Sequence, residues 1–465
     1  MKSSRAQTHS RVYRIPALRF EAEQRLTSYA GIVIFQALFQ RLQLKERLRR
    51  CFSHLGMQPI FGHQTVMMIL VVHLLLGFRR LRGMDYYRSD PLVARVVGLR
   101  ALPDVSTVSR ALAATDGRCV SEVRDLLRGM VADRLKAEDF ARLTLDFDGS
   151  VQSTTGHAEG TAVGFNKVKK GARSYYPLFC MIAQTGQFWD LHHRPGNVHD
   201  SNGAADFMRA CVHAARLTGT KARIEARTDS AFFSEELLRQ WNAEGVEFAC
   251  SVPFERFPEL KSRIETRGSW EPVDDRWSVF EDAWRPKSWT TDYRFLFLRQ
   301  RKVKQRKGPL QLDLFTPIDY EFEFKAIVTN KRESAKAVLL FHNGRGGQEK
   351  ILGEAKQHAA LDLVATRGLH GNQLFTLAGM LAHNLGRELQ MQTQRPSHAT
   401  EPKRPARWDF LQLGTIRQRL LHLAGRLTRP QGELTLTIND NQAVREDLLE
   451  FMTTLARTEP AERVA

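Results

Sequence analysis

The stretch LTLDFDGS, residues 143–150, marks the point at which the sequence pattern changes from helical to extended. Apolar and polar side chains alternate along it with a period of two up to Asp148, which is typical of a half-buried strand. Two further apolar runs, at 176–184 and 188–194, flank a Thr-Gly pair and predict a hairpin. We therefore expect three successive strands, the last two of them antiparallel.

Helices and strands alternate after this hairpin. An amphipathic helix is predicted over 204–217, a strand over 222–229, a helix over 234–242 and a strand over 247–253. The order β-β-β-α-β-α-β combines an antiparallel hairpin with parallel crossovers, which favours a mixed sheet covered by helices. The predicted fold class is therefore α/β.

The rest of the 465-residue chain predicts further domains around this sheet. The predicted parts are a helical DNA-binding domain (1–138), the first part of the sheet domain (139–253), a β-rich insertion (254–335), the second part of the sheet domain (336–394) and a basic linker with a C-terminal helical region (395–465). Within the last part, a helix is expected over about 415–427, with a short helix after it.

The composition narrows the class of protein. Hydrophobic residues make up 42% of the chain and charged residues 26%, as in a globular protein. The net charge of +18 favours a polyanionic partner, and nucleic acid before membrane, because the apolar run at 65–78 is too short to span a bilayer. The five cysteines form no CxxC pair and the N-terminus has no apolar signal-peptide core, so a reducing cytoplasm is predicted.

Aspartates at strand ends are the first candidate metal ligands. Asp148 ends its strand and is followed by Gly-Ser, which leaves room for a cation and a phosphate. Asp146 shares its face of the strand and is the alternate to Asp148. Asp229 ends the strand at 222–229 and precedes a helix start. Plainer roles are open to these residues, since Asp-Gly is a turn pair and Asp229 can cap the next helix.

A helix further along the chain carries a third carboxylate. In FHNGRGGQEKILGEAK, residues 341–356, Arg345 and Glu349 are four residues apart and Lys356 follows seven later, so all three share one face. One carboxylate between two cations suits a metal ligand flanked by phosphate contacts, although a solvated ion pair is the commoner use of this spacing. Because Mg²⁺ keeps several waters, about three Asp or Glu ligands are sufficient for a site.

Basic segments predict where DNA is held. Ser109 and Arg110 face outward on a helix that Ser106 or Thr107 can cap, as in a helix that enters a DNA groove, with ordinary helix packing as the alternative. Arg194 lies in the loop HHRPGN, where a strand end followed by an Arg-Pro-Gly loop is favoured over a zinc site because no cysteine accompanies the histidines. Such a loop would allow Arg194 to contact DNA. The basic run in the insertion contributes Arg301, Lys302 and Lys304.

These stretches, in this order, resemble the DDE transposases of bacterial insertion sequences, and among them DDE domain group 1, of the IS thirteen-eighty type and related to the IS-four-like enzymes. The likeness is carried by LDFDGS, HHRPGNVHDSNGA, ARTDSAFFSEELL and HNGRGGQEKILGEAK. The last stretch matches the family's Tyr-x2-Arg-x3-Glu-x6-Lys signature at Arg345, Glu349 and Lys356, with His342 in place of the Tyr. The resemblance covers about residues 20–390.

The resemblance implies a ribonuclease-H-like catalytic domain in which Asp148, Asp229 and Glu349 bind metal, with two Mg²⁺ ions for which Mn²⁺ can substitute. The implied reaction is hydrolysis of a strand at each terminal inverted repeat, followed by attack of the 3′-hydroxyl on target DNA. Double-stranded DNA is the expected partner, a homodimer the expected state in the DNA complex, and the bacterial cytoplasm at the nucleoid the expected location. The alternatives are a catalytically silent, transposase-derived DNA-binding protein and a metal-dependent nuclease without strand transfer.

Overall fold

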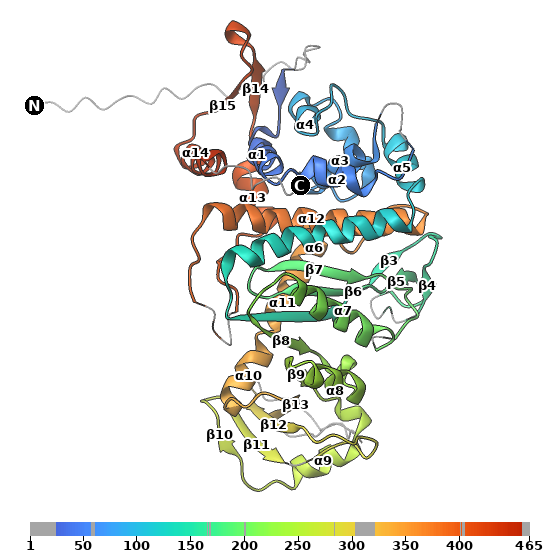
Figure 1. Ribbon diagram of the computed structural model, residues 1–465, viewed down its shortest axis with the longest axis vertical. Helices are drawn as coiled ribbons and strands as arrows, with labels where there is room; N and C mark the ends of the chain where they lie inside the picture. The colour runs from blue at the N-terminus through green and yellow to red at the C-terminus, as the bar shows by residue number, and fades with distance from the viewer. Residues whose placement is uncertain are drawn as a thin grey trace, which may run out of the picture.

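The computed structural model describes residues 25–56, 61–164, 166, 169–199, 201–282, 284–302, 321–399, 401 and 405–457. Figure 1 shows an elongated molecule with the N-terminal helices at one end, two long helices across the middle and a sheet that extends to the opposite end. The two long helices are α6 (Gly117–Glu138) and α12 (Leu369–Thr393). Among the described residues, no helix is long and apolar enough to cross a membrane.

One nine-stranded sheet forms the centre of the molecule, in the order β10-β11-β12-β13-β9-β8-β2-β6-β7. Its first five strands along the chain are β2 (Arg142–Gly149), β6 (Leu178–Ile182), β7 (Gln187–His192), β8 (Arg223–Thr228) and β9 (Glu247–Ser251). β2 is antiparallel to β6 and parallel to β8, which is parallel to β9. This mixed arrangement confirms the predicted α/β fold class, a mixed sheet with flanking helices.

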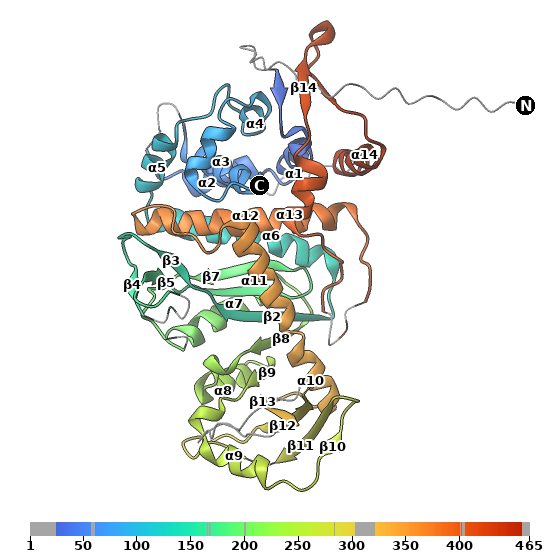
Figure 2. The same ribbon diagram turned by 180° about the vertical axis from the view of Figure 1, so that it is seen from behind.

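The alternation of side chains along β2 decides which face of the sheet carries carboxylates. Leu143, Leu145 and Phe147 are buried in one apolar cluster with residues of α7 (Ala204–Leu217) and α8 (Glu235–Ala243). Because strand side chains alternate between faces, Asp146 and Asp148 lie on the other face. Helix α11 (Gly346–Ala359) crosses the sheet in Figure 2, and its residue Gln348 donates to the Phe147 carbonyl.

The predicted β-rich insertion adds its strands to this same sheet. β11 (Trp277–Asp282), β12 (Arg294–Arg301) and β13 (Phe322–Thr329) form an antiparallel meander, with the two-residue β10 (Glu271–Pro272) at its edge. β13 pairs antiparallel with β9, so the insertion continues the sheet past its last parallel strand. The domain boundaries themselves stay predictions.

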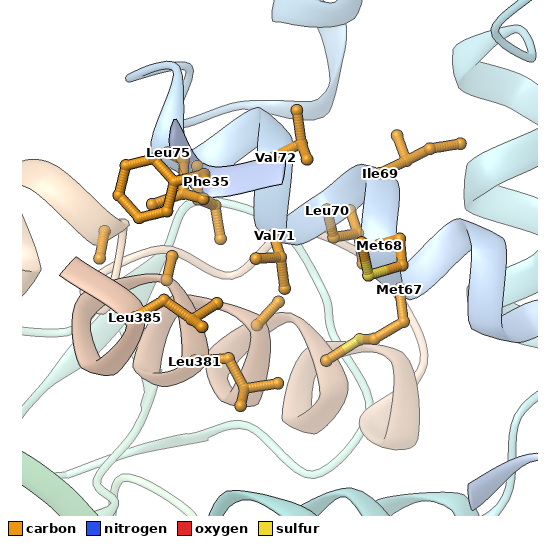
Figure 3. Close-up of a cluster of buried hydrophobic side chains, with 14 of the residues drawn as sticks. Phe35, Met67, Met68, Ile69, Leu70, Val71, Val72, Leu75, Leu381 and Leu385 are labelled. Carbon is orange, nitrogen blue, oxygen red and sulfur yellow. The ribbon is translucent and has the colours of Figure 1, made fainter. Parts of the chain in front are cut away.

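A helical layer covers the other side of α12. Its helix α3 (His63–Leu75) is buried around almost its whole circumference, because the apolar run it contains has no polar face. Figure 3 shows Met67, Val71 and Leu75 of α3 on the side that faces Leu381 and Leu385 of α12, with Phe35 beside Leu75, while Ile69 and Val72 point away from α12. Burial of each such side chain contributes roughly 1.5–3 kcal/mol. Helix α12 thus joins the helical layer to the sheet.

The remaining elements connect these layers. They are β1 (Leu26–Thr27), α1 (Val33–Arg41), α2 (Leu44–Cys51), α4 (Pro91–Val96), α5 (Val105–Ala113), β3 (Gln152–Thr154), β4 (Ala162–Val163), β5 (Arg173–Tyr175), α9 (Pro258–Glu265), α10 (Ala335–Asn343), α13 (Leu413–Ile416), β14 (Gly425–Thr428), β15 (Thr435–Ile438) and α14 (Gln442–Arg457). Single turns of 3₁₀-helix lie at Ala30–Ile32, Ser230–Phe232, Phe254–Arg256 and Pro430–Gly432, and a longer one at Leu81–Tyr86.

Two local predictions are wrong. The helix expected over 415–427 ends at Leu421, and β14 follows, paired with both β1 and β15. The end of this helix packs against the distant N-terminal segment. A Cβ on Gly31 would lie 1.5 Å from the Leu420 carbonyl oxygen, so only glycine allows the two backbones to lie this close. Helix α5 begins at Val105, before either predicted cap, because Asp104 occupies the N-cap position.

Candidate active site

Three predicted carboxylates converge around one guanidinium. Asp148 lies near the end of β2 and Asp229 directly after β8, and since these strands are parallel neighbours, both residues reach the same edge of the sheet. Glu349 lies in the first turn of α11. Arg345 Nη1 is 3.9 Å from Asp148 Oδ2 and 4.0 Å from Asp229 Oδ2, and its Nη2 is 3.2 Å from Glu349 Oε1.

Each aspartate uses one oxygen for the local backbone and turns the other toward Arg345. Asp148 Oδ1 accepts from the Gly149 amide at 2.9 Å, and Asp229 Oδ1 accepts from the Ala231 amide at 3.0 Å. The plain capping role of Asp229 is therefore confirmed, and it coexists with a place in the site. These backbone bonds fix the orientation of both carboxylates, which a preorganised metal site needs.

The charges at this site favour a bound cation. Burial and then the nearby charge of Asp229 raise the pKa of Asp148 to about 6, while Arg345 acts in the opposite direction. Three carboxylates face a single guanidinium, whose Nη1 is buried with no hydrogen-bond partner among the described residues. Carboxylate oxygens are the donors that Mg²⁺ and Mn²⁺ prefer. The residues present thus fit divalent cations.

The site opens on the side of Glu349. The side chain of Asp148 is 21% exposed and that of Asp229 is 32% exposed, whereas Glu349 is 62% exposed. A substrate approaching from solvent would therefore meet Glu349 first. The glycines on either side of Arg345 lie where α10 ends and α11 begins, so this junction presents Arg345 and Glu349 together.

Asp146, the alternate first ligand, has a different environment. It is almost fully buried, and its two carboxylate oxygens each accept from Arg227 at 2.6 Å. Arg227 also donates to the carbonyl of Phe341 at 2.9 Å, which ties β8 to the end of α10. Both oxygens of Asp146 are thus engaged beneath the site, and the geometry favours Asp148 as the ligand.

The position of the family's tyrosine is occupied by a buried, neutral histidine. His342 Nε2 lies 3.0 Å from Ser251 Oγ and its Nδ1 lies 2.8 Å from Lys325 Nζ. Burial and then the charge of Lys325 hold the pKa of His342 well below its ordinary value. Since Lys325 must donate to Nδ1, the proton of the neutral ring lies on Nε2 and is donated to Ser251.

Lys325 is a site residue that the sequence analysis missed. It comes from β13 of the insertion and also donates to the side chain of Asn343 at 2.9 Å. Burial and then the charge of Arg345 lower the pKa of Lys325 to about 8, while Glu349 opposes the change. In the sequence, Lys325 ends the alternating run FEFK. This run predicts a strand, but it does not indicate that the lysine contacts another side chain.

The structure separates the predicted DNA-binding residues. Lys356 is half-buried on α11, about 10 Å along the helix axis from Glu349 at 1.5 Å per residue, and among the described residues it forms no ion pair with the three carboxylates.

The other predicted DNA-binding residues lie on different elements. Arg110 is exposed on α5, where it donates to Thr107 Oγ1. Arg301 is exposed at the end of β12 and Lys302 follows it. Lys304 lies outside the described residues.

Arg194 is buried and forms hydrogen bonds within the protein. Its side chain is almost completely buried, and its guanidinium donates to the carbonyls of Tyr176, His199 and Asn202. The loop that contains Arg194 is therefore held by its own arginine. This burial is at odds with the predicted DNA contact, because no exposed guanidinium is left for a phosphate.

The chain is similar to known proteins along most of its length. The family model described as "Transposase DDE domain group 1" matches residues 17–460. Similar solved structures include a piggyBac transposase synaptic complex with hairpin DNA, with 11% identity, a TM-score of 0.41, and coverage of 79% of this chain and 77% of that chain. Another is the Drosophila P element transposase strand transfer complex, with 12% identity, a TM-score of 0.24 and coverage of 50% of each chain.

Proposed function

Since the chain belongs to the transposase DDE domain group 1 family, we propose that it is an active transposase that binds the terminal inverted repeats of an insertion sequence, cleaves the DNA there and transfers the cut strand to target DNA. The observation that carries this proposal is the convergence of Asp148, Asp229 and Glu349 around Arg345. A DNA-binding protein without catalysis has no need of three carboxylates turned toward one another at a sheet edge.

The three carboxylates would hold one or two divalent cations, Mg²⁺ or Mn²⁺. Such ions, when bound, supply positive charge to the attacking and leaving oxygens of a phosphodiester. The protein's own contribution is to fix the ligands: the Gly149 and Ala231 amides orient the two aspartates, and Gln348, which is buried, acts to lower the pKa of Asp148. Asp148 must lose its proton to act as a ligand, so its raised pKa makes the site sensitive to pH near 6.

Arg345 and Lys356 would contact phosphates of the DNA. Arg345 is beside all three carboxylates, so its guanidinium is within reach of any phosphate that approaches a cation there. Arginine forms paired hydrogen bonds with phosphate oxygens, which orients the strand. Lys356, two turns further along α11, would act on a neighbouring phosphate.

Double-stranded DNA is the proposed partner, at both the transposon ends and the target. The net charge of +18 is consistent with a backbone of phosphates, since counterion release contributes much of the affinity for DNA. Two transposon ends must be brought together before transfer, so we propose that the DNA complex contains two copies of this chain. Sedimentation of the protein with and without end DNA measures that stoichiometry.

The test uses duplex oligonucleotides that carry the inverted repeats flanking the gene. In Mg²⁺ or Mn²⁺, the wild-type protein is expected to nick these ends and to join them to a target plasmid. Binding without nicking would contradict the enzyme proposal and support a silent DNA-binding protein. Nicking without joining would contradict the transfer step and support a nuclease.

A further inference from the structure

A second basic region lies away from the carboxylate site, between the helical layer and the two long helices. Residues of α1, α2, α4, α6 and α12 surround a cavity of about 1360 Å³. Figures 1 and 2 both show α1 and α2 over α6 and α12. None of its lining residues belongs to the carboxylate site, so the cavity is a separate feature of the molecule.

The acidic residues of the cavity are already paired. Asp133 is 2.8 Å from Arg47, and Glu388 is 2.5 Å from Arg134. Glu46 pairs with Arg49 at 2.8 Å. These carboxylates are therefore neutralised by nearby arginines. They leave little negative charge to neutralise the remaining lysines and arginines of the cavity.

Four further basic residues line the cavity without a carboxylate partner. They are Arg41 from α1, Lys45 from α2, Arg95 from α4 and Lys136 from α6. Among the described residues, none of the four lies within 4 Å of a carboxylate, and Lys45, Arg95 and Lys136 are exposed. Each of these four helices thus contributes one basic residue to the lining of the cavity that has no carboxylate partner.

Arg41 is the most deeply placed of these four basic residues. Its Nη1 is buried and has no hydrogen-bond partner among the described residues. Burial lowers the pKa of Arg41, and Glu388 offsets part of this effect. Glu388 is itself paired with Arg134, and among the described residues no carboxylate lies within 4 Å of Arg41, so an anion bound beside Arg41 would stabilise its charge.

The amino group of Lys45 lies close to the turn that follows α4. A Cβ on Gly98 would lie 2.7 Å from Lys45 Nζ, so the amino group rests against the turn that follows α4. That position is near the C-terminal end of α4, where the helix dipole favours a cation. The Lys45 charge is thus positioned without being neutralised by a carboxylate.

We propose that this cavity binds the sugar–phosphate backbone of duplex DNA, away from the phosphodiester that is cut. Gln36, Gln40 and Gln43 line the same space and add side-chain amides that can donate to phosphate oxygens. A polyanion matches cations spread over four elements better than a single small anion does. The inference rests on the proposed function, because a transposase must grip its DNA outside the cleaved bond.

The test measures equilibrium binding of a fluorescent duplex by anisotropy in EDTA, across a series of NaCl concentrations. The variant carries Arg41→Gln, Lys45→Gln and Lys136→Gln. Each lost phosphate contact lowers the slope of log affinity against log salt by roughly 0.9, so a fall of roughly 2–3 is expected. At fixed salt the affinity is expected to fall at least about tenfold.

A matched control removes the same charge from exposed lysines elsewhere, as Lys221→Gln, Lys287→Gln and Lys336→Gln. Its slope is expected to stay close to that of the wild type. An equal fall in both variants, or an unchanged slope in the cavity variant, would overturn the proposal. Arg41→Lys keeps the positive charge, so it is expected to retain most of the slope of log affinity against log salt. A fall in slope seen with Gln but not with Lys at position 41 is then due to the lost charge rather than to unfolding.

Two other occupants give different results, and either result contradicts the proposal. If the cavity holds an acidic segment of a second copy, the triple variant will change the sedimentation of the DNA-free protein and leave the salt slope intact. If it holds a small phosphate compound, inorganic phosphate at low millimolar concentration will displace no duplex, yet will raise the Tm of the wild type alone. Cleavage by the carboxylate site is measured separately, so failure of one proposal does not imply failure of the other.

Discussion

Arg227 holds both carboxylate oxygens of Asp146 at 2.6 Å, immediately beneath the carboxylate of Asp148. Two aspartates that are two residues apart on one strand therefore have different environments. The deeper one forms a buried ion pair that connects β2 to β8, and the outer one faces Arg345. This division yields opposite predictions for the two residues.

Asp146→Asn is expected to destabilise the protein by about 3–5 kcal/mol, because breaking a buried pair leaves the Arg227 charge uncompensated. Urea unfolding at pH 7 measures the change. The matched control is Asp148→Asn, which removes a carboxylate from the same strand face. Equal destabilisation by both substitutions would mean that the two aspartates have the same structural role.

Asp148→Asn is expected to stabilise the metal-free protein at neutral pH. The pKa of Asp148 is about 6 in the folded protein, against an ordinary 3.8, so folding favours the protonated form. The stability that the protonated Asp148 carboxyl contributes is fully present below pH 3.8 and is lost as the pH rises through 6. Relative to the wild type, the variant should gain about 2 kcal/mol between pH 4 and pH 8. Unfolding measured in EDTA at several pH values checks this, and a constant difference would contradict it.

Divalent cations are expected to raise the Tm of the wild-type protein, and the affinity should increase between pH 5 and pH 7. The reason is that the Asp148 proton, whose pKa is about 6, must leave before a cation binds. Calorimetric titration with Mn²⁺ in two buffers measures the released proton. Glu349→Gln is expected to weaken binding, whereas Asp440→Asn, an exposed carboxylate in the C-terminal region, should not. Equal affinity for both variants would place the cation elsewhere.

His342→Tyr, which restores the residue of the family signature, is expected to destabilise this protein by about 2 kcal/mol. The larger ring must enter a buried position, and it cannot both donate to Ser251 and accept from Lys325 in the geometry that His342 uses. His342→Gln keeps one acceptor and one donor, so its effect should be smaller. Thermal unfolding of both variants measures the difference. If tyrosine proved the better tolerated of the two, the histidine would not be acting through these hydrogen bonds.

Local patterns in the sequence were sufficient to predict the central part of the nine-stranded sheet. The period-two alternation of β2, the hairpin and the helix at 204–217 all agree with the structure, because each depends on residues near one another in the chain. Convergence of Asp148 and Asp229 also follows from the parallel order of their strands. Glu349 was a candidate because it shares a helix face with Arg345 and Lys356 and matches the family signature, but its proximity to both aspartates required the three-dimensional structure.

Pairings between distant segments could not be predicted from one sequence. Asp146 lies 81 residues from Arg227, and nothing near either residue indicates the partner. The strand β14 forms against β1 from the other end of the chain, which overrode a helical pattern. Arg194 shows the same limit, since a basic loop residue became buried by bonding to neighbouring carbonyls.

In the proposed function, Asp148, Asp229 and Glu349 form the metal site that cleaves DNA. The most direct measurement is the single-turnover rate at which Asp148→Asn nicks an inverted-repeat duplex in Mn²⁺, compared with Asp440→Asn. We predict a rate at least about a thousandfold lower for Asp148→Asn, equivalent to roughly 4 kcal/mol of transition-state stabilisation, with unchanged affinity for the duplex. Nicking by Asp148→Asn at the rate of the control would contradict the account.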